Sequence, residues 1–257
     1  TGKMNKIALI TGASAGIGQA TAILLAKNRF DVIITGRRSE KLFELEKQIK
    51  SETGVRALAL SFDICNREEV ENAVKRLPEE WKNIDVLVNN AGLAAGLDKI
   101  QEGDIDDWEQ MIDTNLKGLL YISRTVAPLM IERKQGHIVN IGSIAGKEVY
   151  PKGNVYCATK HALEALTKAM RIDMVEHGIK VTGICPGMVE TEFSMVRFKN
   201  DRQKAENVYK GFTPLYAEDI AETILFAVTR PAHVNINDML VMPTAQASGA
   251  IVHKSGA

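Results

Sequence analysis

A glycine-rich turn between an apolar run and a helical pattern constrains this fold more than any other feature. The stretch Lys6–Ile23 reads KIALITGASAGIGQATAI; a strand-like run ends at Ile10, and apolar residues at helical spacing follow the turn. Strand, glycine turn and helix in this order bind a dinucleotide pyrophosphate in open α/β sheets. We expect Gly12 to permit the tight turn, Gly16 to let backbone approach phosphate oxygens and Gly18 to let the helix pack against the strand.

Two other interpretations of the turn remain open. The spacing G-x-x-x-G-x-G differs from the G-x-G-x-x-G dinucleotide fingerprint, so a glycine turn without a ligand is the plainer alternative. Residues 12–16 also match G-x-S-x-G, the nucleophile elbow of hydrolases, with Ser14 as nucleophile. The elbow's oxyanion hole draws on an earlier strand, and no strand is expected before residue 6, so we favour the nucleotide.

Apolar strands alternate with helical patterns along the chain, and no linker rich in proline or glycine divides it. Strands are expected at Ile7–Ile10, Asp31–Thr35, Arg56–Ser61, Val86–Asn89, Gly136–Ile141, Lys180–Ile184 and Met239–Met242, and helices at about 17–28, 39–52, 67–77, 106–134, 155–177 and 217–228. Ser39 is the expected N-cap of the second helix. This alternation predicts a Rossmann-type, doubly wound parallel sheet in one domain spanning residues 1–257. Ligands of such sheets bind beyond the carboxyl ends of the strands.

Composition excludes several classes of function. The 257 residues carry a formal net charge of zero, so no long-range field attracts nucleic acid or an anionic membrane, and no apolar run approaches a membrane span. The three cysteines, Cys65, Cys157 and Cys185, form no C-x-x-C and indicate a reduced, cytoplasmic setting. The five histidines form no H-E-x-x-H, so we expect no metal site.

The end of the second strand carries two arginines. Arg38 lies about 20 positions after the glycine turn, where an acidic residue binds the ribose of NAD and an arginine accommodates the 2′-phosphate of NADP. Arg37 is adjacent, and a guanidinium grips phosphate oxygens by paired hydrogen bonds. The pair therefore indicates NADP, unless both arginines are only solvated surface residues.

Two further strand ends carry polar residues. Asp63, followed by Ile64, is placed to accept a hydrogen bond from an adenine amino group. The turn Asn89–Gly92 is placed to brace the glycine loop by side-chain-to-backbone hydrogen bonds. Taken alone, either segment is equally well explained as a structural turn.

The chemistry is indicated by Tyr156-x-x-x-Lys160 at the start of a helix, after a strand that ends at Gly142-Ser143. The i,i+4 spacing puts tyrosine and lysine on one helix face. A free phenol has a pKa of about 10, and a nearby ammonium lowers it, so Tyr156 becomes an acid/base for an alcohol or carbonyl. Ser143 can place its hydroxyl on the same oxygen.

With these residues in place, the chain resembles the short-chain dehydrogenase/reductase family. The matching motifs occur in the family's order over residues 6 to about 190: Thr11-Gly12-x-x-x-Gly16-x-Gly18, Asn89-Asn90-Ala91-Gly92, Asn115, Ser143, Tyr156-x-x-x-Lys160 and Pro186-Gly187. The resemblance implies that Tyr156 is the general acid/base, that Lys160 binds the nicotinamide ribose and tunes the phenol, that Ser143 polarises the substrate oxygen and that Asn115 holds a water linking Lys160 to solvent.

The resemblance and the strand ends together give the expected cofactor contacts. These are Gly12, Ser14, Gly16, Ile17, Gly18, Arg37, Arg38, Asp63, Ile64, Asn90, Ala91, Gly92, Tyr156, Lys160, Pro186, Gly187, Val189 and Thr191.

A second, less specific resemblance concerns the substrate. The segments 186–198 and 231–236 resemble the NADP-dependent 3-hydroxy acid dehydrogenases, which oxidise serine, allo-threonine and related β-hydroxy acids. The polar segment 188–211 is then the expected substrate lid, and Arg197 the candidate clamp for the substrate carboxylate, beside Ser143 and Tyr156. Arg197 facing solvent or a neighbouring subunit fits equally well.

Alternatives and partners follow from the same residues. The first rival is an NADPH-dependent reductase of ketones, diketones or other carbonyls; the rival outside enzymology is a nucleotide-binding redox sensor, which needs no acid/base. In the family, helices such as those expected at 106–134 and 155–177 pair across two-fold axes, so we expect a homo-oligomer, a dimer or tetramer.

Overall fold

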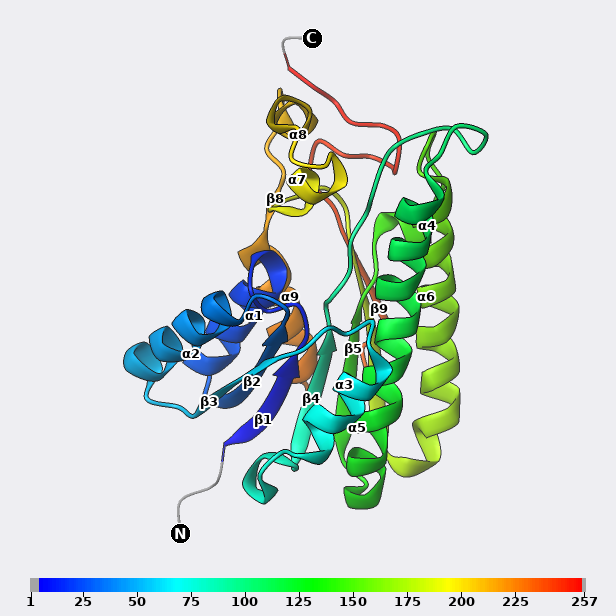
Figure 1. The fold of residues 1–257 in the computed structure, drawn as a ribbon. Helices are drawn as coiled ribbons and strands as arrows, with labels where there is room; N and C mark the ends of the chain where they lie inside the picture. The colour runs from blue at the N-terminus through cyan, green and yellow to red at the C-terminus, as the bar shows by residue number, and fades with distance from the viewer. Residues whose placement is uncertain (1–4, 256–257) are drawn as a thin grey trace.

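The computed structural model describes residues 5–255, and its centre is a seven-stranded sheet in which every neighbouring pair is parallel (Figure 1). The strand order is β3-β2-β1-β4-β5-β6-β9. The strands are β1 Lys6–Ile10, β2 Phe30–Gly36, β3 Ala57–Ser61, β4 Ile84–Asn89, β5 Gly136–Ile141, β6 Ile179–Pro186 and β9 Asp238–Val241. Each overlaps a strand expected from the sequence, and the predicted α/β class is confirmed.

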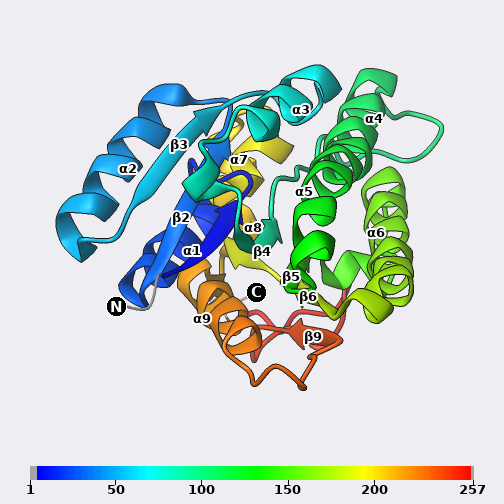
Figure 2. The ribbon, with the colours of Figure 1, turned by 90° about the horizontal axis from the view of Figure 1, so that it is seen from below.

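Helices cover both faces of the sheet (Figure 2). On one face lie α1 Gly16–Lys27, α2 Ser39–Thr53 and α9 Ala217–Val228, whose buried side chains share one hydrophobic cluster. On the other lie α3 Arg67–Lys75, α5 Leu119–Arg133 and α6 Asn154–Met174, with α4 Ile105–Ile112 packed against α6. The strands between are therefore covered twice, and all six residues of β5 are buried.

Two expectations about helices were wrong in detail. The helix expected over 106–134 is interrupted by a π-helical turn, η2 Asp113–Gly118, between α4 and α5. Ser39 does not cap α2; it is the first helical residue, and the preceding Arg38 makes no side-chain cap hydrogen bond. Single-turn π-bulges often mark functional sites, and η2 contains Asn115.

The chain order places the functional edge of the sheet. After β3 the chain returns to β4 on the opposite side of β1, so the direction of winding reverses between β1 and β4. A crevice opens at such a point beyond the carboxyl ends of the strands. The segment after β6 forms β7 Val189–Glu190, α7 Phe193–Arg197, α8 Arg202–Tyr209 and β8 Leu215–Tyr216 beyond that edge (Figure 1). Among the described residues, no helix is long and apolar enough to cross a bilayer.

Candidate active site

A cleft of about 410 Å³ lies at the carboxyl edge of the sheet. All but three of the residues expected to bind cofactor or substrate, or to act in catalysis, line it. The three exceptions are Gly18, Asn115 and Arg197, which lie behind or beside its wall. Residues from five strand ends and from the segment after β6 are thus brought to one cavity.

The glycine turn is held by the turn that follows β4. Asn90 donates from Nδ2 to the carbonyl oxygens of Thr11 at 2.9 Å and Gly12 at 3.2 Å. The hydroxyl of Thr11 accepts from the backbone N–H groups of Asn90 and Ala91 at 3.0 Å. Gly12 has φ +64°, and a Cβ on Gly18 would collide with the Gly12 carbonyl. The expected bracing is therefore formed, and Gly18 is needed for close packing rather than for ligand contact.

The amino end of α1 is suited to an anion. Its first turn carries no acidic residue, and its N-cap residue Ala15 makes no side-chain hydrogen bond to the free backbone N–H groups. These N–H groups and the helix dipole favour negative charge. Gly16 keeps this backbone open toward the cleft. The arrangement fits the pyrophosphate of a dinucleotide.

Two arginines stand at the end of β2, on the same side of the cleft. Arg38 donates from Nε to Ser14 Oγ at 3.0 Å and from Nη1 to Glu192 Oε2 at 2.8 Å. Arg37 also lines the cleft. Ser14 thus contacts a guanidinium, and no histidine is among the described residues that line the cleft, so the geometry of a hydrolase triad is not formed around Ser14.

Tyr156, Lys160 and Ser143 meet at the other end of the cleft. Tyr156 and Lys160 lie on the first turns of α6, and Ser143 follows β5. Lys160 Nζ donates to the carbonyl oxygen of Ile141 at 3.1 Å and lies 5.8 Å from the centre of the Tyr156 ring. The face-sharing expected from the i,i+4 spacing is present, and one acid/base pair is placed beside one hydroxyl.

The electrostatics of this pair differ from the expectation. Burial raises the pKa of the Tyr156 phenol above its usual value, and hydrogen bonding with Ser143 opposes that rise only in part. Burial lowers the pKa of Lys160 to about 8. Lys160 is not among the groups that shift the phenol pKa in this cleft, because its ammonium donates to a backbone carbonyl and burial is the largest influence on both groups.

Asn115 stands behind the catalytic end. Its Oδ1 accepts from the backbone N–H of Leu93 at 2.9 Å, and its Nδ2 donates to the Leu93 carbonyl at 2.9 Å and to Thr159 Oγ1 at 3.1 Å. The π-helical turn η2 places this side chain between the loop after β4 and helix α6. Asn115 thus fixes the loop after β4 against the helix that bears Tyr156.

Arg197 lies beside Tyr156 rather than in the main cleft. Its guanidinium carbon is 5.6 Å from the centre of the Tyr156 ring and 5.5 Å from that of Tyr150. Nε donates to the Gly96 carbonyl at 3.3 Å and Nη1 to the Tyr150 hydroxyl at 3.1 Å. The buried Nη2 has no hydrogen-bond partner among the described residues. A buried guanidinium with one unmatched donor is suited to an anionic group.

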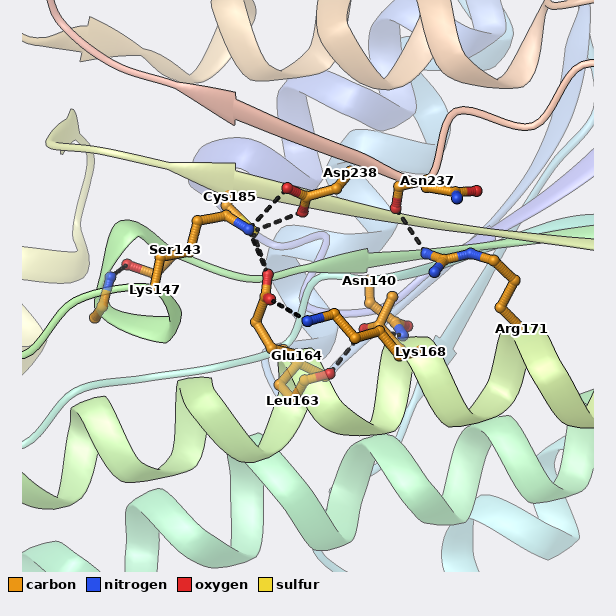
Figure 3. A network of polar contacts seen from close by, with 12 residues as sticks. Asn140, Ser143, Lys147, Leu163, Glu164, Lys168, Arg171, Cys185, Asn237 and Asp238 are labelled. Carbon is orange, nitrogen blue, oxygen red and sulfur yellow. Dashed lines mark hydrogen bonds and ion pairs between the residues drawn. The ribbon is translucent and has the colours of Figure 1, made fainter.

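A network of charges lies behind Ser143 (Figure 3). Lys147 Nζ is 2.7 Å from both Glu164 Oε1 and Asp238 Oδ2, and Cys185 Sγ lies 3.4 Å from Glu164 Oε1. Burial acts to lower the pKa of Lys147, but the hydrogen bonds that it donates to the two carboxylates raise the pKa overall. The oxygen and sulfur atoms are close enough together to hold a metal ion, but here the lysine ammonium supplies the positive charge. The network joins the loop after Ser143 to α6, β6 and β9.

Sequence reasoning missed three side chains of this site. Glu192 contacts the arginine of the phosphate end, Tyr150 orients Arg197, and Phe193 packs its ring 5.8 Å from that of Tyr156. Each depends on contacts between distant segments. Two acidic residues flank Thr191 in the sequence, and nothing in the sequence distinguishes Glu192 from Glu190 as the one that reaches Arg38.

Comparison with known proteins supports the assignment made from the motifs. The family model described as short chain dehydrogenase matches residues 6–202. The NADP-dependent 3-hydroxy acid dehydrogenase YdfG of Salmonella typhi is 47% identical over 97% of this chain and 100% of its own. Sulfoacetaldehyde reductase 2 of Chromohalobacter salexigens is 43% identical over 96% of this chain and 98% of its own. The closed form of serine dehydrogenase complexed with NADP⁺ superposes with a TM-score of 0.91 at 45% identity, covering 97% of this chain and all of that one. The chain belongs to the short-chain dehydrogenase family of oxidoreductases.

Proposed function

We propose that this chain is an NADP-dependent dehydrogenase of small 3-hydroxy acids such as serine, allo-threonine and 3-hydroxyisobutyrate. The observation that carries the proposal is a single cleft with an arginine pair and an open helix N-terminus at one end and Ser143, Tyr156 and Lys160 at the other. Relatives of similar length that are 43–47% identical include enzymes named for NADP and 3-hydroxy acids.

The chain's own residues divide the work as follows. Arg37 and Arg38 hold a 2′-phosphate, and the start of α1 holds the pyrophosphate. Tyr156 accepts the proton of the substrate hydroxyl in its phenolate form, or donates it as the phenol in the reductive direction, and Ser143 holds the same oxygen. Lys160 binds the ribose and supplies positive charge below the phenol. A nicotinamide held by these residues would supply the acceptor for the hydride of the hydroxyl-bearing carbon.

We further propose that Arg197 recognises the substrate anion and that residues 188–211 act as a lid. Three observations support this role: the unmatched Nη2, the position over the Tyr156 ring and the location of Arg197 on α7. Part of the same segment, including Thr191 and Val196, lines the cleft. A lid that carries the anion-binding group closes only over a substrate that bears the anion.

A sulfonate is the second candidate for that anion. A guanidinium binds the planar carboxylate and the three-oxygen sulfonate alike, and one relative is named as a sulfoacetaldehyde reductase. The favoured direction then becomes reduction of an aldehyde. The carbonyl-reductase alternative without an anion requirement lacks a role for the unmatched nitrogen of Arg197.

Initial rates on matched substrates test these proposals. NADP⁺ and NAD⁺ are crossed with L-serine, L-allo-threonine, 3-hydroxypropionate, its sulfonate analogue 2-hydroxyethanesulfonate and its neutral analogue 3-hydroxypropionamide. We expect NADP⁺ with a hydroxy acid to give the highest kcat/KM. In Arg197→Ala, kcat/KM for the anions should fall about 10- to 100-fold while the amide is little affected. Arg197→Lys keeps the charge and should recover part of the loss. Equal losses on the acid and the amide contradict the clamp, and a preference for the sulfonate selects the second candidate.

We also propose a cytoplasmic homo-oligomer. The three cysteines are unpaired in the structure, as expected of a reduced setting. Exposed apolar side chains occur on α4, α5 and α6, where a second copy would cover them: Ile105, Ile112, Leu120 and Ile172. Sedimentation of the purified chain tests the assembly, and a monomer at micromolar concentration contradicts it.

A further inference from the structure

Glu192 belongs to the segment after β6 but lies at the phosphate end of the cleft. Its carboxylate accepts from Arg38 Nη1 at 2.8 Å and pairs with Lys41 Nζ at 3.2 Å. Arg38 and Glu192 are 154 positions apart in the chain, so this contact joins the end of β2 to the start of α7. No motif or expected cofactor contact accounts for a carboxylate at this place.

The Glu192 carboxylate occupies groups that a phosphate needs. Arg38 already donates Nε to Ser14, and its Nη1 is held by Glu192. A phosphate binds a guanidinium best through two neighbouring N–H groups, so a carboxylate on one of them blocks the forked geometry. Two anions on one cation also repel each other. The pKa of the Glu192 carboxyl is lowered, chiefly by the hydrogen bond from Arg38, so this group is charged at neutral pH.

Glu192 is also attached to the substrate end. It directly precedes α7, which carries Phe193 against the Tyr156 ring and Arg197 over that ring. Moving the start of α7 therefore moves two side chains that contact the catalytic tyrosine. One short segment spans the cleft from the phosphate-binding arginine to the acid/base.

We propose that Glu192 is a specificity-determining residue whose carboxylate competes with a cofactor 2′-phosphate for Arg38 and Lys41. Binding of the phosphate releases Glu192 and, with it, the start of α7. The inference rests on the proposed NADP-dependent function. It goes beyond that function, because the lid then responds to the phosphate that distinguishes NADP from NAD. By linkage, whatever holds α7 in the released position also strengthens phosphate binding.

Calorimetric titration with two cofactor fragments tests the competition without turnover. Adenosine 2′,5′-bisphosphate carries the 2′-phosphate, and adenosine 5′-monophosphate lacks it. We expect Glu192→Gln to bind the bisphosphate about three- to tenfold more tightly than wild type, because the phosphate no longer has to displace an exposed ion pair. The variant and wild type should bind the monophosphate with the same affinity. Glu190→Gln is the matched control: this exposed carboxylate lies two residues earlier, in β7, and makes no ion pair among the described residues.

Equal or weaker binding of the bisphosphate by Glu192→Gln overturns the proposal, because Glu192 then only orients Arg38. A separate variant, Arg38→Ala, distinguishes this failure from failure of the proposed function. If Arg38→Ala leaves bisphosphate affinity unchanged, the 2′-phosphate does not bind at Arg38, and if the double variant Arg37→Ala/Arg38→Ala also leaves it unchanged, the proposed NADP preference is wrong.

Hydrogen exchange tests the release of α7. Saturating bisphosphate should increase amide exchange over residues 192–198 in wild type, and saturating monophosphate should not. In Glu192→Gln this segment should already exchange at the faster rate and respond to neither fragment. The same response to both fragments, or no response in wild type, contradicts the coupling.

Discussion

At the catalytic end of the cleft, Tyr156 and Lys160 keep 8% and 7% of their accessible surface, whereas at the phosphate end the side chains of Arg38 and Glu192 keep 45% and 51%. The buried pair is positioned by one helix and by backbone groups such as the Ile141 carbonyl. The exposed pair is positioned by partners from distant segments. The catalytic end is therefore held by buried, local contacts, and the phosphate end by exposed contacts between distant segments.

The difference has a functional consequence. A buried charge near fixed dipoles keeps its geometry, since moving it leaves a polar group unmatched. An exposed ion pair contributes little and exchanges partners readily, because water and salt screen it. Fixed geometry suits proton transfer, and exchangeable partners suit the capture and release of a cofactor phosphate.

Removing the phenol hydroxyl should have the largest effect and should leave the phosphate end intact. We expect Tyr156→Phe to lower kcat about 10³-fold, since the acid/base is lost while the ring still packs against Phe193. Binding of adenosine 2′,5′-bisphosphate should change less than about twofold, since the phenol lies far from Arg38 along the cleft. Initial rates with saturating NADP⁺ and the best substrate give kcat, and calorimetry gives the affinity for the bisphosphate.

Tyr150→Phe is the control, because it removes a hydroxyl that contacts Arg197 and should affect KM more than kcat. A Tyr156→Phe enzyme with an undiminished kcat contradicts the mechanism. A parallel loss of bisphosphate affinity contradicts the independence of the two ends.

The buried lysine of the catalytic end should make the free energy of unfolding depend on pH. Burial lowers the Lys160 pKa from 10.5 to about 8. Between these values the unfolded chain binds more protons than the folded one, so stability rises with pH across that window. Below about pH 8 the folded chain bears the full cost of burying the Lys160 ammonium, and above that pH the cost decreases as the folded lysine loses its proton.

Urea unfolding of wild type and Lys160→Met at several pH values measures this contribution. The free energy of unfolding of wild type, relative to the variant, should increase by roughly 2 kcal/mol from pH 8 to 9.5. Deleting the exposed Lys41 by Lys41→Met reports the effect of losing a lysine charge as such. A difference between wild type and Lys160→Met that stays constant with pH contradicts a strongly buried ammonium.

The same contrast explains how much the sequence predicts. Local rules place Tyr156 and Lys160 on one helix face, Gly12 in a positive-φ turn and Asn90 under the glycine loop, because each depends on neighbours in sequence or on strand ends that must meet. They do not predict the Arg38–Glu192 pair, which depends on where a segment 154 positions away comes to rest.

Two further features required the packed structure. The π-helical turn that carries Asn115 has no signal in its own residues, and the side chain it presents is held by contacts with Leu93 and Thr159. The direction of the Tyr156 pKa shift depends on burial, and helical spacing alone suggests the opposite sign. Motifs thus give the identity of the reacting groups, whereas their energies depend on what surrounds them.

The Lys147 network has an exposure between those of the two ends of the cleft. Of the changes considered, its disruption should have the smallest effect. The Lys147 side chain keeps 22% of its surface and bridges Glu164, one turn after Lys160, to Asp238 at the start of β9 (Figure 3). Lys147→Met removes the cation between the two carboxylates and leaves Glu164 with only the longer ion pair to Lys168 at 3.6 Å. We expect a loss of about 1–2 kcal/mol in the free energy of unfolding, more than an exposed pair contributes and less than a fully buried one.

Glu164→Gln in the Lys147→Met background removes one of the repelling charges and should recover part of that loss. The two substitutions should therefore be non-additive in a double-mutant cycle measured by urea unfolding. Strict additivity indicates that the bridge contributes nothing, and that the loop after Ser143 is held by its backbone alone.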